Sequence, residues 1–325
     1  MTHHTSGRTR LHRSELAVPA TSERFFQKAA DSAADVIFLD LEDAVAPRLK
    51  NQARKLAIDA LNQVDWGNKT MAVRVNDLET AWALDDIVDV VKHAPRLDMI
   101  LLPKAGSGFD IRFVDQLLTL LERGSESGKH IGLEALIETA RGVAYVEEIA
   151  AASPRLEALI FGVGDYTVSM QTFDRVYGRP SERYAILTHG QEASAPRELH
   201  WNDQWHFAMA RMANACRANG LRPIDGPFTD FADEAGYRAS ARRAAALGFE
   251  GKWAIHPVQI DLANEVFSPS AHDLAWAEDV QRLMTEAQER GDGAANADGV
   301  LVDMAHLKQA QAILERQEMI RQAQG

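Results

Sequence analysis

Short apolar runs alternate with amphipathic stretches along most of this 325-residue chain. The runs are mostly continuous in apolar residues, which is typical of parallel strands that are buried on both faces. They predict eight strands, at residues 15–19, 36–41, 71–75, 99–103, 132–137, 158–163, 222–225 and 251–255. The stretches between them predict helices, at residues 22–34, 47–62, 80–94, 109–123, 139–152, 203–219 and 233–247. This repeat favours an α/β fold of the (β/α)8 TIM-barrel type, with an open doubly wound sheet as the alternative.

Two segments depart from the repeat. Residues 171–200 are too long and too rich in turn residues for an ordinary connection, so they are expected to form an active-site loop or an interface element. Residues 266–325 follow the predicted barrel of residues 1–265 and contain two helical stretches, at 271–290 and 303–324. The stretch between these helices, 291–299, is rich in Gly, Asp, Asn and Ala. We expect a C-terminal extension that moves on this linker.

Composition and charge narrow the classes of partner. The chain has 35 Lys and Arg against 47 Asp and Glu, a net charge of −12, which argues against a broad nucleic-acid or anionic-membrane surface. No apolar run reaches the roughly 18–20 residues of a membrane span, and we expect no secretory signal. The single cysteine, Cys216, excludes an internal disulfide and a multi-cysteine metal site and is expected in a helix core. A cytoplasmic location fits best.

Polar residues occur where the apolar runs end. They are Glu42, Asp43, Arg74, Asn76, Lys104, Glu138, Asp165, Asp225 and His256, with Gly164 directly before Asp165. In a β/α barrel the carboxyl ends of all strands lie on one face, and that face carries the chemistry. We therefore expect these side chains to surround one site.

Glu138 and Asp165 follow consecutive predicted strands, which lie roughly 4.8 Å apart in a sheet. Two carboxylates at that spacing repel each other unless a cation lies between them, and oxygen ligands suit Mg²⁺. The alternative is that they cap helices or pair with Arg141. Gly164, in the sequence Gly162-Val-Gly-Asp165, would let a ligand approach the backbone, or would simply serve a turn.

Arg74 ends an apolar strand and would stabilise a developing oxyanion at the barrel mouth. A buried ion pair with Glu42 or Asp43 is the alternative, and both roles can hold together. A group of basic residues near the start of the chain would bind cofactor phosphates, or would belong to a solvated surface; they are Arg8, Arg10, Arg13, Arg24 and Lys28. Asp303, read alone, predicts the N-cap of the last helix.

Several motifs together resemble the citrate lyase β-subunit-like family of the HpcH/HpaI aldolase superfamily. They include Phe38-Leu-Asp-Leu-Glu-Asp-Ala-Val45, Val73-Arg-Val-Asn76, Gly162-Val-Gly-Asp165 and Gly251-Lys-Trp-Ala-Ile-His-Pro257. Ile224-Asp-Gly-Pro-Phe228 and Leu301-Val-Asp303 are similar to the malyl-CoA/β-methylmalyl-CoA lyase branch. Together these motifs span nearly the whole chain.

The resemblance implies a TIM barrel with a C-terminal helical lid, assembled as trimers or hexamers. It implies Mg²⁺, with Mn²⁺ as a substitute, held by Glu138 and Asp165, with Glu42 and Asp43 around them. It further implies Arg74 as the oxyanion contact and Asp303 as an acid/base that enters the barrel of a neighbouring subunit. The phosphates of a CoA thioester would meet basic residues near the start of the chain, namely Arg13, Arg24 and Lys28.

The activity implied is reversible cleavage of a 3-hydroxyacyl-CoA, such as malyl-CoA or β-methylmalyl-CoA, to acetyl-CoA or propionyl-CoA and glyoxylate. Alternatives on the same scaffold are a malyl-CoA thioesterase and a citramalyl-CoA lyase. A non-catalytic acyl-CoA-binding protein is disfavoured, because every polar position that turnover needs is present. Lys104 is the candidate if the chemistry uses an imine instead.

Overall fold

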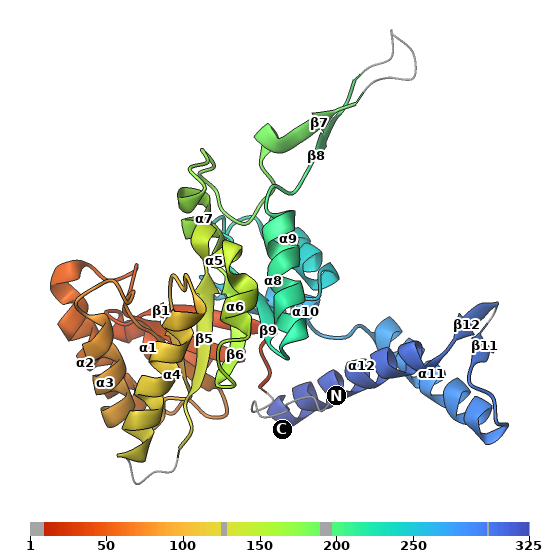
Figure 1. The fold of residues 1–325 in the computed structure, drawn as a ribbon, viewed down its shortest axis with the longest axis horizontal. Coiled ribbons are helices and arrows are strands. Elements are labelled where there is room, and N and C mark those ends of the chain that lie inside the picture. The colour runs from red at the N-terminus through yellow and green to blue at the C-terminus, as the bar shows by residue number, and fades with distance from the viewer. Residues whose placement is uncertain (1–9, 125–128, 189–196, 298, 325) are drawn as a thin grey trace. The chain divides into compact units, whose positions relative to one another are not determined.

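The computed structural model describes residues 10–124, 129–188, 197–297 and 299–324. The chain divides into two compact units, Met1–Asn264 and Glu265–Gly325. In the first unit eight parallel strands close into a barrel in the order β1-β10-β9-β6-β5-β4-β3-β2 (Figure 1). The strands are β1 (Ser14–Pro19), β2 (Val36–Asp40), β3 (Thr70–Arg74), β4 (Met99–Leu102), β5 (Gly132–Ile137), β6 (Leu156–Phe161), β9 (Arg222–Asp225) and β10 (Gly251–Ala254). The predicted TIM barrel is confirmed.

Helices cover the outside of the barrel (Figure 1). They are α1 (Phe26–Ala30), α2 (Lys50–Gln63), α3 (Ala83–His93), α4 (Gly108–Arg123), α5 (Ala140–Ala144), α6 (Val146–Ala150), α7 (Val163–Ser169), α8 (His206–Ala218), α9 (Glu234–Ala246) and α10 (Val258–Val266). The helix predicted at 139–152 is divided at Tyr145, whose backbone leaves the helical region. Cys216 is fully buried in α8, as expected.

The barrel interior is built in layers. Its middle is an apolar cluster to which Phe38, Leu136 and Trp253 belong. The rings of Phe38 and Trp253 lie 4.6 Å apart between centroids. Because side chains alternate along a strand, Glu134 and Glu138 share the inward direction of Leu136 and lie on either side of this apolar layer. The fold thus separates a polar carboxyl end from a polar amino end.

The long segment at 171–200 forms a hairpin where the structure describes it. After a 3₁₀ turn, η3 (Glu182–Tyr184), strand β7 (Ala185–Leu187) pairs antiparallel with β8 (Leu199–Trp201). The hairpin projects from the barrel in Figure 1 and carries exposed apolar side chains such as Ile186 and Leu199. Residues 189–196 lie outside the described part of the chain.

The structure of the second unit differs from the prediction of a flexible linker at 291–299. It contains α11 (Ala271–Glu289), β11 (Ala295–Ala297), β12 (Val300–Val302) and α12 (Met304–Gln324). The predicted linker at 291–299 contains β11, which pairs antiparallel with β12. Met284, Ala295 and Val302 are buried in one apolar core with Ala310. The two helices are therefore joined by a packed hairpin, because burial of its apolar residues outweighs the small-residue composition.

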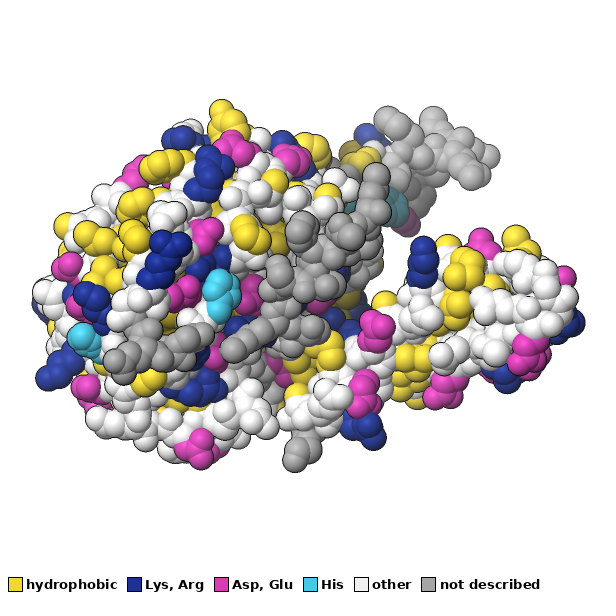
Figure 2. Space-filling view, turned by 60° about the horizontal axis from the view of Figure 1, so that its bottom comes forward, with side chains coloured by type: hydrophobic (Ala, Val, Ile, Leu, Met, Phe, Trp, Pro, Cys, Tyr) yellow, Lys and Arg dark blue, Asp and Glu magenta, His cyan; other side chains and the backbone are white. Residues whose placement is uncertain are grey.

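Basic and acidic side chains are interspersed over the barrel face shown in Figure 2. This mixture accords with a chain whose net charge is negative but which carries both signs. Among the described residues, no helix combines the length and the apolar character that crossing a membrane requires.

Candidate active site

The carboxyl end of the barrel is organised around a buried ion pair between neighbouring strands. Asp40 ends β2 and stands in register with Arg74, which ends β3. Arg74 donates from Nε to Asp40 Oδ1 and from Nη2 to Oδ2, both at 2.7 Å. Burial alone would raise the pKa of Asp40, but the Arg74 charge and these hydrogen bonds hold it below its ordinary value. The pair fixes the guanidinium in one orientation.

Arg74 also faces the two acidic residues that follow β2. Its Nη1 lies 3.2 Å from Glu42 Oε2 and 3.6 Å from Asp43 Oδ2. The ion-pair interpretation of Arg74 is thus correct, although the two-pronged partner is Asp40. Asp40 is not among the site residues that the sequence predicts. It could have been found from its position as the last residue of an apolar strand, next to a strand that ends in arginine.

Lys104 links carboxylates that come from different strands. It follows β4 with a φ of 51°, a left-handed backbone that residues other than glycine rarely adopt. Its backbone N–H donates to Glu138 Oε1 at 2.8 Å, and its ammonium group bonds to Glu42. The same Nζ lies 3.5 Å from Asp165 Oδ2. These acids raise the pKa of Lys104 despite its partial burial, so it is a permanent cation among the carboxylates.

Glu138 and Asp165 differ in their access to solvent. Glu138 is 2% exposed, and burial raises its pKa to about 8, with Asp165 adding to the rise and Arg74 opposing it. The side chain of Asp165, in the first turn of α7, is 36% exposed. A Cβ at Gly162 would overlap the Glu138 side chain, so glycine is required there. Two carboxylates, one buried and one accessible, fit Mg²⁺, which keeps positions for water and substrate.

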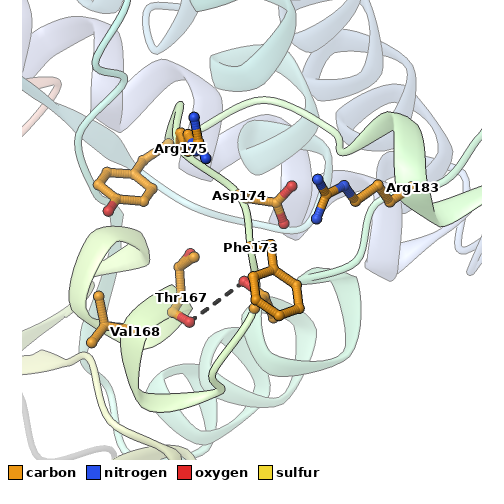
Figure 3. Close-up of a pocket in the computed structure, with 8 residues that line it drawn as sticks. Thr167, Val168, Phe173, Asp174, Arg175 and Arg183 are labelled. Carbon is orange, nitrogen blue, oxygen red and sulfur yellow. Dashed lines mark hydrogen bonds between the residues drawn. The ribbon is translucent and has the colours of Figure 1, made fainter.

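Gly164 faces protein. A Cβ at Gly164 would lie 3.3 Å from the ring of Tyr177, which belongs to the segment after α7. This aromatic contact lies on the side where a Cβ would stand, and the approach of a ligand to the backbone of Gly164 stays a prediction. The same segment and α7 line an open pocket of about 550 Å³ (Figure 3). Its lining includes Thr167 and Val168 of α7, and Phe173 and Arg183.

The predicted basic residues fall at both ends of the barrel. Arg24 and Lys28 are exposed in the turn η1 (Glu23–Phe25) and in α1, which follow the carboxyl end of β1. Arg13 precedes β1 and is buried, and its guanidinium bonds to Asp35 at 2.9 and 2.8 Å. The expected contact of Arg13 with CoA phosphates is therefore corrected, because its charge is neutralised at the amino end of the barrel.

Arg10 also lies at the amino end of the barrel. Arg10 bonds to Glu157, a residue of β6 near its amino end. Arg8 lies outside the described residues.

Asp303 belongs to the second unit, immediately before α12. Its Oδ1 accepts a hydrogen bond from the backbone N–H of Ala305 at 2.9 Å, which is the predicted capping interaction. It also lies 2.8 Å from His306 Nδ1, and these hydrogen bonds hold the pKa of Asp303 below its ordinary value. The carboxylate is half exposed, and so accessible to a reactant.

Comparisons with known proteins identify the family of the chain. Residues 13–257 match the family described as HpcH/HpaI aldolase/citrate lyase. The chain is 47% identical over 312 residues to an L-malyl-CoA/β-methylmalyl-CoA lyase of Cereibacter sphaeroides, covering 96% of each chain. It is 34% identical to a (3S)-malyl-CoA thioesterase of the same organism, covering 95% of each.

A solved structure is also similar. It is the protein CitE of Mycobacterium tuberculosis in complex with magnesium, acetoacetate and coenzyme A. The TM-score is 0.70 at 28% identity, over 94% of this chain and 98% of that one. The family match and the 47% identity decide the classification, and this chain belongs to the HpcH/HpaI aldolase/citrate lyase family.

Proposed function

We propose that this protein is a Mg²⁺-dependent carbon–carbon lyase. It reversibly cleaves malyl-CoA or β-methylmalyl-CoA to acetyl-CoA or propionyl-CoA and glyoxylate. The observation that carries the proposal is the arrangement of Arg74, Glu138 and Lys104 at one end of the barrel, with Arg74 locked by Asp40. The relative with 47% identity bears the name of this activity.

Glu138 and Asp165 would hold the Mg²⁺, with Glu42 and Asp43 around them; Mn²⁺ would substitute. When bound, the ion supplies a Lewis acid that polarises the carbonyl of the 2-oxo acid. The similar CitE of Mycobacterium tuberculosis forms a complex with magnesium, acetoacetate and coenzyme A, which supports a bound Mg²⁺ in this family. Lys104 keeps Glu42 oriented and, through its backbone N–H, keeps Glu138 oriented.

Arg74 would stabilise the charge that develops on the CoA fragment. In cleavage the β-hydroxyl would give its proton to the ionised carboxylate of Asp303, the Cα–Cβ bond would break, and its electron pair would pass into the thioester as an enolate. The negative charge then resides on the thioester oxygen, where a fixed guanidinium is most effective in a site closed to water. Asp40 holds Arg74 in place through both N–H groups, so little reorganisation is needed during the reaction.

Asp303 would deliver the proton to the enolate carbon, or remove it in the condensation direction. Its lowered pKa and accessible carboxylate suit a base that starts ionised. In this proposal residues 266–325 act as a lid over the barrel of a neighbouring subunit in a trimer or hexamer, and closure excludes water. The exposed apolar side chains of the β7–β8 hairpin support self-association.

Exposed basic residues at the carboxyl end of β1, Arg24 and Lys28, would contact the CoA phosphates. A phosphate group attracts such cations even at a solvated surface. In this position they would anchor the nucleotide end of the thioester while its acyl end reaches the barrel mouth.

The reaction products test the proposal. Enzyme, acetyl-CoA, glyoxylate and Mg²⁺ are incubated, and the products are separated by chromatography. Accumulation of malyl-CoA supports the lyase, whereas free malate with free CoA supports the thioesterase activity for which the 34% identical relative is named. Pyruvate in place of glyoxylate tests the citramalyl-CoA alternative. No carbon–carbon bond formation with either oxo acid would reject the proposal.

The role of Asp303 has its own test. Asp303→Ala is expected to retain Mg²⁺ affinity and to lose about 1,000-fold in turnover, because the enolate lacks its proton donor. The matched control is Asp292→Ala, another exposed acid of the same unit. Size-exclusion chromatography with light scattering shows whether the assembly is intact. Unimpaired turnover of Asp303→Ala would exclude Asp303 as the acid/base.

A further inference from the structure

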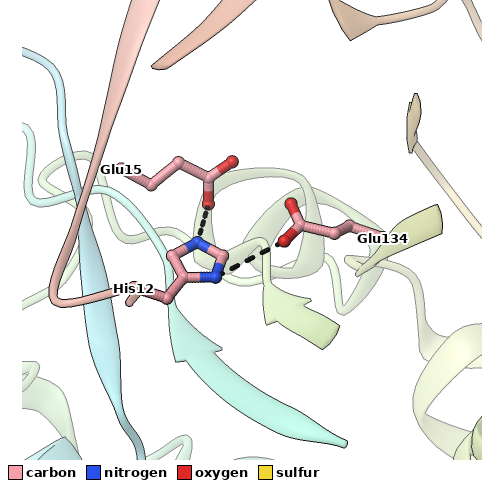
Figure 4. A group of neighbouring side chains, drawn as sticks. All are labelled: His12, Glu15 and Glu134. Atoms are coloured by element: carbon pink, nitrogen blue, oxygen red, sulfur yellow. Dashed lines mark hydrogen bonds and ion pairs between the residues drawn. The ribbon is translucent and has the colours of Figure 1, made fainter. Parts of the chain in front are cut away.

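The amino end of the barrel interior holds three titratable side chains that the lyase chemistry does not use (Figure 4). His12 precedes β1, Glu15 lies on β1, and Glu134 lies on β5. Each is at most 2% exposed. In the strand order β1 and β5 stand on opposite sides of the barrel, so the cluster bridges it.

One side of the His12 ring is already committed to a hydrogen bond. Its Nε2 lies 3.1 Å from Glu15 Oε2, and the same oxygen accepts the indole N–H of Trp253 at 2.7 Å. When Nε2–H donates to Glu15, the ring carries its free electron pair on Nδ1. A carboxylate behind a histidine in this way is the usual support of a histidine that binds a metal through its other nitrogen.

The remaining polar atoms of the cluster are buried and lack hydrogen-bond partners among the described residues. They are His12 Nδ1, Glu15 Oε1 and both carboxylate oxygens of Glu134. His12 Nδ1 faces Glu134 Oε1 at 3.4 Å. The guanidinium groups of Arg10 and Arg222 are directed to Glu157, each at 3.0 Å. The charge of Arg222 acts on all three residues, although its guanidinium bonds to Glu157. Buried acceptor atoms gathered in this way gain from a further positive charge among them.

The spacing of these atoms suits one bound ion. One donor atom from each of the three residues lies within 4.8 Å of the others. The 3.4 Å between Nδ1 and Oε1 is close to the edge of a tetrahedron with metal–ligand bonds of about 2.1 Å. An imidazole nitrogen beside carboxylates is a donor set of borderline ions such as Zn²⁺, in contrast to the all-oxygen set at the carboxyl end.

We propose that this cluster binds a structural Zn²⁺ ion at the amino end of the barrel, with His12 Nδ1 and the Glu134 carboxylate as ligands and Glu15 holding the imidazole ring from its Nε2 side. The ion connects the segment before β1 with β5 across the barrel floor. It is distinct from the Mg²⁺ of the proposed lyase site and contributes to stability at the end of a TIM barrel that does not carry the chemistry.

The experiment compares metal content and thermal stability in the full-length protein. Because the site is closed to solvent, the protein is purified from cells grown with added Zn²⁺, desalted and analysed by elemental mass spectrometry. About one zinc per chain is expected. Removal with a chelator at raised temperature should lower Tm by about 5 °C or more, and Zn²⁺ alone should restore it, whereas Mg²⁺ alone should not.

Two variants locate the ion. Glu134→Gln is expected to lose the bound zinc, whereas Glu157→Gln, a buried acid at the same end that already has arginine partners, should keep it. Anomalous diffraction at the zinc edge on wild-type crystals gives the same answer if Glu134→Gln does not fold. Glu138→Gln should retain the zinc, which separates this site from the lyase metal.

Three results would overturn the proposal. Wild-type protein without zinc and with a Tm that Zn²⁺ leaves unchanged would show that protons fill the cluster. Equal zinc content in Glu134→Gln and wild type would place the ion elsewhere. Anomalous density away from His12 would likewise place the ion elsewhere.

Discussion

Glu134 and Glu138 stand four residues apart on the inward face of one strand, and they reach opposite ends of the barrel. Both are almost fully buried, and burial raises the pKa of each to about 8. Their surroundings differ. Glu138 accepts the N–H of Lys104 and faces Arg74, whereas Glu134 faces His12 and Glu15. The same residue type in the same strand therefore serves two different environments.

The difference shows how the fold distributes charge. At the carboxyl end, two cations that follow or end neighbouring strands, Arg74 and Lys104, contact the acids, and two acids, Asp43 and Asp165, remain accessible. This is a site prepared for a substrate. At the amino end, the acids are closed off, and no described lysine or arginine bonds to Glu134. An apolar layer that includes Phe38 and Trp253 separates the two, so each end can be altered independently.

The largest expected effect comes from removing the carboxylate at the carboxyl end. Glu138→Gln should lower turnover about 1,000-fold, because the amide is a weaker ligand for the proposed Mg²⁺. Isothermal titration calorimetry with Mg²⁺ and a turnover assay measure both quantities. Glu79→Gln, at an exposed position, is the control. If Glu138→Gln retained both the affinity for Mg²⁺ and the turnover of the wild type, the contrast between Glu138 and Glu134 would be wrong.

The second-largest expected effect comes from changing Arg74, which forms an ion pair with Asp40 beside Glu138. Arg74→Lys should lower kcat/KM about 100-fold and also lower Tm, because lysine cannot bond Asp40 through two N–H groups at once. Steady-state kinetics and thermal unfolding are measured together. Arg112→Lys, which changes an exposed arginine 3.7 Å from Glu148, should alter neither. A loss confined to KM would argue that Arg74 binds substrate without stabilising the enolate.

A smaller effect tests the cation among the acids. Lys104→Met should raise the affinity for Mg²⁺ about tenfold, because the ammonium group competes with the ion for Glu42 and Asp165. Calorimetry at pH 7.5 measures the change, with exposed Lys55→Met as the control. A fall in affinity would mean that the orientation of Glu42 by the ammonium group of Lys104 outweighs its competition with the ion.

The smallest expected effect concerns Asp98, an acid that lies at the amino end of the barrel like Glu134 but has hydrogen-bond donors around it. Asp98 accepts the N–H of Met71 at 2.9 Å and pairs with Arg96 and Lys129. Burial opposes ionisation, but these donors hold its pKa below the ordinary value. A lowered pKa contributes stability that is present above the unfolded value of about 4 and is lost as the pH falls through the folded value.

Wild-type protein should therefore lose more stability between pH 5 and pH 3 than Asp98→Asn does. Urea unfolding at pH 5, 4 and 3 gives the two slopes, with Glu79→Gln as the control for a solvated acid. Equal slopes for wild type and Asp98→Asn would show that the donors leave the titration of Asp98 unchanged.

Much of the fold followed from local pattern. Continuous apolar runs located the eight barrel strands to within about two residues, because burial on both faces leaves a strong signal. The glycine and small residues at 291–299 predicted a flexible linker, and this prediction was wrong because tertiary packing decided the structure there. The stretch at 291–299 became a hairpin because Ala295 and Val302 joined a core supplied by both terminal helices. A composition rich in small residues indicates flexibility only for a segment against which no other part of the protein packs.

The sequence by itself determined which residues end the strands, and hence that Arg74, Glu138 and Asp165 belong to one face of a barrel. Only the tertiary structure decided which side chains pair with each other. The Asp40–Arg74 bond follows from strand register, and the meeting of His12 with Glu134 follows from barrel closure. Arg13 went to the amino end and bonded Asp35 for the same reason. Periodicity records whether a side chain is buried, whereas its partner comes from a distant part of the chain and is set by the closed sheet.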